Sequence, residues 1–189
     1  MTQFEFLLLL AAVILGLAIS DLAVSVHRLL AAAKRVKWDW LAPLAALVAF
    51  LKIVTQWWTW FGDEKFAGAL TFEMFLGVLT SAVLLFLLTA TSLPDDFGEH
   101  PVDLRAYYAR VSRRYWWLFI AYFVAVNAVS IWAQVVIDKS QIDLIQPGWL
   151  VLPFALSFVF IRNRWWHTLG LVAFAALYIG QYFGQTLPH

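Results

Sequence analysis

The sequence predicts an all-α protein, an integral-membrane bundle of six transmembrane helices with a short amphipathic interfacial helix before the fourth. Of the 189 residues, 63% are hydrophobic and only 13% are charged, against about 45–50% and about 25% in soluble domains. Six apolar stretches are long enough, or nearly so, to cross a hydrocarbon core about 30 Å thick. They are residues 4–26, 41–61, 66–91, 115–137, 149–161 and 165–183, and together they make residues 1–189 a single transmembrane domain.

Proline positions fit the ends of the predicted helices. Pro43 falls in the first turn of the second helix, where a missing N–H group costs little. Pro94 ends the third helix, and Pro147 with the glycine after it opens the fifth. The fifth stretch is short and contains Pro153, so we expect it to be kinked or tilted, or to begin as early as Ile142. The first stretch is long for a signal peptide and starts without Lys or Arg, so we expect a retained helix.

The segment before the fourth stretch has an amphipathic pattern. From Asp103 onward, Leu104 and several aromatic residues share one helical face, and arginines cluster away from it. The arginines are Arg105, Arg110, Arg113 and Arg114. This pattern predicts a short helix that lies on the inner membrane surface and runs into the fourth helix.

Basic residues concentrate in alternate loops. The first, third and fifth loops hold ten of the thirteen Lys and Arg residues, whereas the second and fourth hold Lys65 and Lys139. The ten are Arg28, Lys34, Arg35, Lys37, Arg105, Arg110, Arg113, Arg114, Arg162 and Arg164. Because cytoplasmic loops carry the excess of Lys and Arg, the odd-numbered loops are predicted to be cytoplasmic and both termini to lie outside.

Aromatic residues at the helix ends predict the same arrangement, because indole and phenol rings settle at the depth of the lipid headgroups. The inner set is Trp38, Trp40, Trp116, Trp117, Trp165 and Trp166. The outer set is Trp57, Trp58, Trp60, Trp149, Tyr178 and Tyr182.

Lys52 is the most informative polar residue. It lies near the middle of the second stretch, where a charged side chain costs about 2.5–3.5 kcal/mol on insertion scales. Thr55, Gln56 and Thr59 follow at helical spacing and extend a polar stripe toward the outer surface. The stripe fits either a hydrated ion path or a structural lysine that is sealed in the bundle against a carboxylate.

Two carboxylates are candidate partners of Lys52. Asp21 shares a face of the first helix with Ser25 and Arg28, and its depth differs from that of Lys52 by about 6 Å. We therefore expect Asp21 and Lys52 to form a pair or to share a water molecule. Glu73, near the outer end of the third stretch, is the competing partner, or else an interfacial residue that faces water.

Amide side chains in the fourth stretch add to the polar set. Asn127 and Gln134 are costly when they face hydrocarbon, so we expect them to face the bundle interior or a partner chain. They fit either helix–helix hydrogen bonding or the lining of an ion path.

Histidines are the remaining candidates for a cofactor site. His27 and His167 lie near the inner ends of the first and sixth stretches, where a bis-imidazole haem site or an interfacial position facing the headgroups is open to them. His100 lies beside acidic residues but lacks a recognised metal-ligand spacing. The chain has no Cys, which excludes thiolate metal sites and disulfides, and it carries no nucleotide-binding or hydrolase motif.

Several short motifs resemble those of a family of short, uncharacterised bacterial integral-membrane proteins with six predicted transmembrane helices. The motifs are residues 38–40 (WDW), 56–60 (QWWTW), 93–96 (LPDD), 103–108 (DLRAYY) and 162–164 (RNR). The resemblance implies a bacterial inner membrane, where the outer side that the basic loops predict for both termini is the periplasm, and it implies no catalytic activity. Asp21 and Lys52 lie outside these motifs.

Three functions fit the sequence. The first is a channel or transporter for a small ion or proton, with Lys52 as fixed charge, Asp21 and Glu73 as carboxylate partners, and polar side chains along the path. Those side chains are Thr55, Gln56, Asn127 and Gln134. The second is an accessory or scaffold subunit that packs against a larger membrane complex, and the third is a haem-binding electron carrier. We expect contact with membrane lipid, a homo-oligomer or a partner membrane protein, no nucleic acid and no required cofactor.

Overall fold

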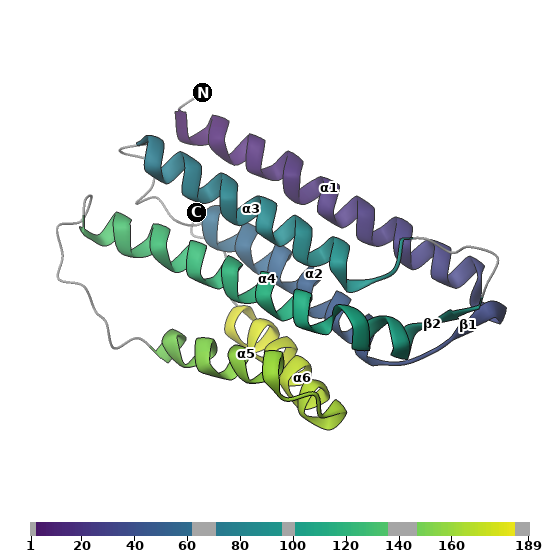
Figure 1. The fold of residues 1–189 in the computed structure, drawn as a ribbon. Helices are drawn as coiled ribbons and strands as arrows, with labels where there is room; N and C mark the ends of the chain where they lie inside the picture. Colours follow the sequence, from purple (N-terminus) through teal and green to yellow (C-terminus); the bar gives the residue numbers. More distant parts are fainter. Residues whose placement is uncertain (1–2, 62–70, 96–100, 136–146, 184–189) are drawn as a thin grey trace.

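The computed structural model describes residues 3–61, 71–95, 101–135 and 147–183 of the chain. Within these ranges the fold is all-helical apart from two strands of two residues each, as the sequence predicts (Figure 1). The α-helices are α1 (Gln3–Ala31), α2 (Leu41–Phe61), α3 (Phe72–Ser92), α4 (Leu104–Ala133), α5 (Val151–Phe160) and α6 (Arg164–Tyr182). The shorter elements are the 3-10 helices η1 (Ala33–Arg35) and η4 (Pro147–Leu150) and the strands β1 (Val36–Lys37) and β2 (Val102–Asp103).

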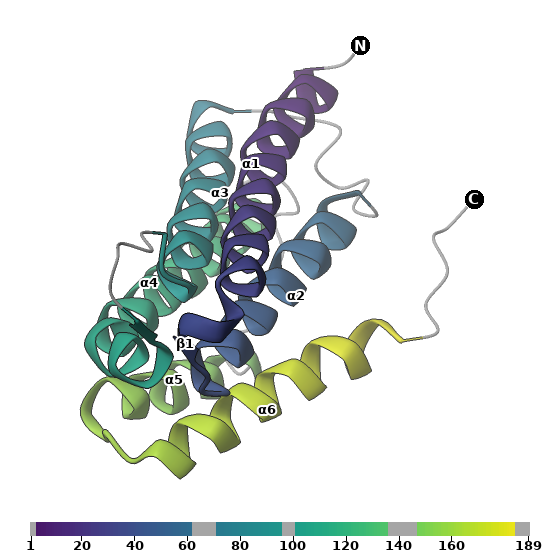
Figure 2. The ribbon, with the colours of Figure 1, turned by 90° about the vertical axis from the view of Figure 1, so that its right-hand side faces the viewer.

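The four long helices form the body of the molecule, and α5 and α6 form a hairpin against it (Figures 1 and 2). Helix α3 packs between α1 and α4, and α5 packs on α4. Helix α2 packs mainly on α6 and α3 and makes less contact with α1, its neighbour in sequence. The helix that precedes α2 in the sequence is therefore not its main packing partner.

Four of the helices, α1 to α4, are long and apolar enough to cross a membrane. Helix α5 has ten residues, which corresponds to about 15 Å. Helix α6 has 19 residues, but it opens with Arg164, Trp165, Trp166 and His167, which lower its mean hydropathy. The membrane character that the composition predicts is thus carried by α1 to α4.

Proline marks the helix ends where the sequence places them. Helix α3 ends at Ser92, and Leu93 adopts an extended conformation with φ −126° and ψ 155°. The residue before a proline avoids the helical region, so Pro94 accounts for this end. Pro43 is the third residue of α2, and Pro147 opens η4 just before α5.

The predicted interfacial helix is not a separate element. Residues 104–133 form one continuous helix of 30 residues, α4, which begins after the N-cap Asp103. Its first turns are held against the bundle because Leu104 and Tyr108 are buried. The Tyr107 hydroxyl also bonds to the carbonyl oxygens of Thr91 and Leu93, at 3.1 and 2.8 Å, beside the end of α3. These contacts hold the first turns of α4 against the rest of the bundle, so the start of α4 is part of one long helix and not a separate helix on the membrane surface.

The first, third and fifth loops meet at one end of the bundle. Strands β1 and β2 pair in parallel, with Val36 opposite Val102, and they join the first loop to the third (Figure 1). An ion pair between Asp39 and Arg164 joins the first loop to the start of α6. The basic residues that the sequence assigns to one side of a membrane are therefore gathered at one end of the fold.

An aromatic core fills the space between α4 and the α5–α6 hairpin. Trp116 is fully buried and stacks on Phe158 with a centroid distance of 4.3 Å. Phe119 and Phe174 pack edge-on or tilted against the same indole. Because the hairpin covers Trp116, its indole faces the protein core and not lipid headgroups.

Candidate functional site

Lys52 is half-buried among aromatic and polar side chains. Its amine stands over the rings of Tyr122 on α4 and Tyr178 on α6, at 5.5 and 5.2 Å from the ring centroids. Gln56, one helical turn after Lys52, is buried and accepts a hydrogen bond from the Tyr122 hydroxyl. We call these four residues the Lys52 cluster. Its cation lies where the ring quadrupoles offset part of the cost of leaving water.

The structure does not bring Asp21 and Lys52 together. Among the described residues, the recorded ion pair is Arg164–Asp39, and no carboxylate bonds to the Lys52 amine. Asp21 lines a cavity of about 350 Å³ with Ser25, Arg28 and Asp95, so the predicted shared face of Asp21, Ser25 and Arg28 is present. Ser25 donates to the Asp95 carboxylate at 3.2 Å, and Arg28 donates to the Asp95 carbonyl at 2.9 Å.

Glu73 occupies the position expected of an interfacial residue. It is exposed in the first turn of α3, where a negative charge favours the helix macrodipole. Thr71, the N-cap residue of the same helix, accepts a hydrogen bond from the Met74 amide at 3.4 Å. No ion pair with Lys52 is recorded within the described ranges.

The other predicted path residues bond largely within their own helices. The Thr55 hydroxyl donates to the Lys52 carbonyl at 3.2 Å, and the Thr59 hydroxyl donates to the Thr55 carbonyl at 2.9 Å. The Asn127 amide donates to the Phe123 carbonyl at 2.7 Å. Gln134 follows α4 as its C-cap residue and is half-buried. The cluster around Lys52 is therefore built by tyrosines from other helices more than by this polar stripe.

A second polar centre, which the sequence reasoning missed, holds the ends of α2 and α6 together. We call Asp39, Trp40, Arg164 and Thr168 the loop junction. Arg164 pairs with the buried Asp39 and stacks over the Trp40 ring, with its guanidinium carbon 3.8 Å from the centroid. The Trp40 indole donates to the Thr168 hydroxyl at 3.0 Å. Asp39 also accepts from the Leu41 amide at 3.0 Å, which caps the start of α2.

His167 is buried next to the loop junction with both ring nitrogens engaged. Its Nε2 lies 2.9 Å from the Ile161 carbonyl, which can only accept, so Nε2 carries the proton. Nδ1 accepts from the Trp116 indole at 3.2 Å and lies 2.9 Å from the Tyr108 hydroxyl. These bonds define a neutral imidazole that is oriented by the core. This arrangement does not present His167 to a haem iron, since its lone pair is already used.

Of the other two candidate histidines, His27 alone lies within the described residues. His27 is exposed on α1. His100 lies outside the described residues. No group of three His, Asp or Glu side chains within the described ranges is arranged to hold a metal ion.

A basic cavity of about 250 Å³ opens beside the loop junction where α2, α4 and α6 begin. Three arginines contribute to it, Arg105 from α4 and Arg162 and Arg164 from the turn into α6. The remaining lining residues are Leu41, Tyr108, Ala109, Ser112 and His167. We call this the arginine cavity.

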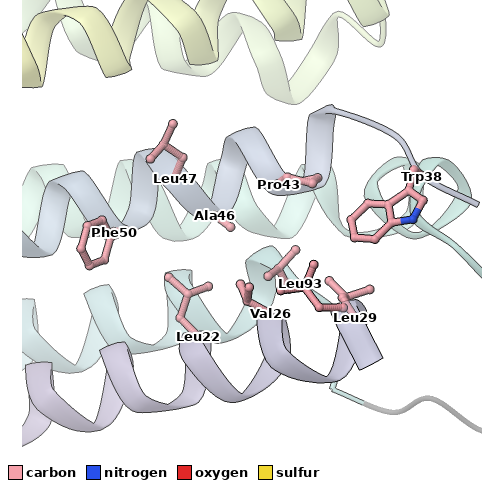
Figure 3. A pocket seen from close by; sticks show the side chains of 10 residues that line it. Leu22, Val26, Leu29, Trp38, Pro43, Ala46, Leu47, Phe50 and Leu93 are labelled. Carbon is pink, nitrogen blue, oxygen red and sulfur yellow. The ribbon is translucent and has the colours of Figure 1, made fainter. Parts of the chain in front are cut away.

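A separate cavity of about 290 Å³ lies between α1 and α2 and is almost wholly apolar. Figure 3 shows Leu22 and Val26 of α1 facing Ala46 and Phe50 of α2, with the Trp38 indole at one end. Such a lining has no group for catalysis or for ion coordination.

Comparison of the chain with protein-family models, curated proteins and solved structures found no match. The functional argument therefore depends on the geometry of the Lys52 cluster, the loop junction and the arginine cavity.

Proposed function

We propose that this protein moves a small anion or a proton across the bacterial inner membrane along a path that passes Lys52. The observation that carries the proposal is the position of the Lys52 amine, held among Tyr122, Tyr178 and Gln56 in the interior of the bundle. A cation at this depth is costly, and the tyrosine rings and hydroxyl groups give it polar surroundings.

The charge of the Lys52 cluster limits which ions the proposed path can transport. Within the described residues no carboxylate neutralises Lys52, so the local field is positive and repels cations. A small anion is attracted to such a field. A proton can instead be exchanged by the Lys52 amine itself, since a lysine can release its proton.

The proposed orientation follows from the basic loops. The end that carries β1, β2 and the loop junction faces the cytoplasm, and both termini are periplasmic. Helices α5 and α6 complete the six proposed membrane spans, with α5 and the 3-10 helix η4 before it together forming the shortest span. Because six helices of this length enclose little space, the path is either a narrow relay or is completed by a second copy of the chain.

Flux in proteoliposomes tests the proposal. Wild-type protein is compared with Lys52→Met and Lys52→Arg, with Lys34→Met, an exposed loop lysine, as the matched control. We expect Lys52→Met to reduce anion or proton flux about tenfold or more, and Lys34→Met to leave it unchanged. Retained flux in Lys52→Arg would indicate an anion path, since arginine stays charged but does not release its proton. Equal flux in wild type and Lys52→Met would refute the role of Lys52.

Partner chains give an independent check of this proposal. A stoichiometric second membrane protein that co-purifies in mild detergent, together with no flux from the isolated chain, would favour an accessory subunit instead.

A further inference from the structure

The arginine cavity combines a high positive charge with few internal partners. Of its three arginines, Arg164 is neutralised by Asp39. Arg105 and Arg162 are exposed, and neither has a recorded hydrogen bond or ion pair with another described residue. The nearest other carboxylate along α4, Asp103, is used as the N-cap and accepts from the Ala106 amide at 2.9 Å. The cavity therefore retains about two positive charges.

One buried donor in the cavity wall lacks a protein acceptor. Arg164 pairs with Asp39 through one terminal nitrogen, while its Nε atom is buried and has no hydrogen-bond partner among the described residues. Because this Nε is buried, an anion in the cavity would meet the terminal N–H groups of Arg164, and the neutral His167 beside it already uses both ring nitrogens.

The volume of the arginine cavity and its hydrogen-bond donors favour a phosphate ester as the ligand. Guanidinium groups present planar forks of N–H donors that match phosphate oxygens, and the Ser112 hydroxyl lies in the same wall. A volume of about 250 Å³ exceeds what a single ordered water or a halide fills. Trp40 and Trp165 form an exposed aromatic pair at this end, with centroids 6.2 Å apart, and exposed indoles favour the region of lipid headgroups.

We propose that the arginine cavity binds a phosphate group through Arg105, Arg162 and Arg164, supplied by the headgroup of an anionic phospholipid or by a free phosphate compound. The site lies at the opposite end of the polar stripe from Thr59 and does not depend on transport past Lys52. The basic loops at this end of the bundle then bind a specific ligand, in addition to their role in setting the orientation of the protein in the membrane.

The test uses delipidated full-length protein in detergent and three probes: phosphatidylglycerol, phosphatidylcholine and inorganic phosphate. Binding is measured by native mass spectrometry and by the shift in melting temperature for wild type and the double variant Arg105→Gln/Arg162→Gln. The matched control is Arg110→Gln/Arg113→Gln, which removes the same charge from exposed positions of α4 that do not line the cavity. Gel filtration establishes that each variant is folded before binding is compared.

We expect wild type to bind phosphatidylglycerol about tenfold or more tightly than the cavity variant does, since each charged hydrogen bond contributes about 1.5–3 kcal/mol. The control variant should match wild type. If inorganic phosphate binds with the same dependence on Arg105 and Arg162, the source is a soluble phosphate compound. The proposal would be overturned if the cavity and control variants lost affinity for phosphatidylglycerol equally, or if both bound it as tightly as wild type does. If the cavity variant does not fold, Arg105→Lys/Arg162→Lys replaces it, because lysine keeps the charge and loses the planar fork.

Discussion

The ion pair of the loop junction makes the sharpest stability prediction. Asp39 is buried, with 5% of its side chain exposed, and Arg164 has 26% exposed. Asp39→Asn keeps an oxygen for the Leu41 amide but removes the charge that neutralises Arg164. Arg164→Gln leaves a buried carboxylate without its cation and also removes the stacking on Trp40.

The expected size of the effect follows from burial. Breaking a fully buried pair costs about 3–5 kcal/mol, and an exposed pair contributes at most about 1 kcal/mol. Because Arg164 is partly screened by water, we expect Asp39→Asn to cost about 2 kcal/mol. Arg164→Gln should cost about 3 kcal/mol, since Asp39 is the more deeply buried partner. For a chain of this length each kcal/mol lowers the melting temperature by about 2–4 °C.

A double-mutant cycle in detergent measures this coupling. Melting temperatures are recorded for wild type, both single variants and the double variant, with Asp103→Asn as control, because Asp103 also caps a helix but has no recorded ion pair among the described residues. We expect the double variant to lose less than the sum of the singles, with a coupling energy of about 1–3 kcal/mol. Additive losses, or melting temperatures equal to wild type, would refute the reasoning.

Three further substitutions test packing that the structure specifies, each by thermal unfolding in detergent. Gly170→Ala should cost about 1–3 kcal/mol, because an added Cβ overlaps the Phe158 ring, whereas Gly180→Ala, with open space around its Cβ, should lose nothing. Trp116→Ala should cost about 3–5 kcal/mol, because its buried indole is removed from the aromatic core, and a loss below 1 kcal/mol would contradict that packing. Tyr107→Phe should cost about 1 kcal/mol of stability, because the Tyr107 hydroxyl bonds to two carbonyls at the end of α3. An unchanged melting temperature would show that these bonds do not stabilise the fold.

Local signals in the sequence predict the helices well. Pro94 ends α3 because it restricts the residue before it, and Asp103 begins α4 because its carboxylate satisfies a free amide of the first turn. The gathering of the basic loops also follows from their spacing along the chain. These features depend on residues close together in sequence, so one sequence is enough to find them.

The partners of buried residues depend on packing that the sequence does not specify. Helical spacing places Lys52 on a face of α2, but it does not say which helix that face meets. Similar depth makes Asp21 a candidate partner, yet α2 packs mainly on α6 and α3, so tyrosines of α4 and α6 surround the amine. The position of Trp116 near a helix end likewise does not reveal that the α5–α6 hairpin covers it.

The loop junction had a weak signal in the sequence. Asp39 stands between two tryptophans in a loop that is otherwise basic, and a lone carboxylate there is expected to find an arginine. The choice of Arg164 over the other arginines is made by the crossing of α6 over α2, which no local pattern encodes. The sequence contains no comparable signal for the burial of His167, because a histidine at the start of a helix can equally well be exposed.

The pairing of β1 with β2 sets an order for biosynthesis. Val36 has been synthesised long before Val102, and α2 and α3 lie between them in the chain. The two strands can meet only after both intervening helices have left the ribosome and returned the chain to the same end. The parallel pair of β1 and β2 therefore forms only when α2 and α3 run in opposite directions along the bundle.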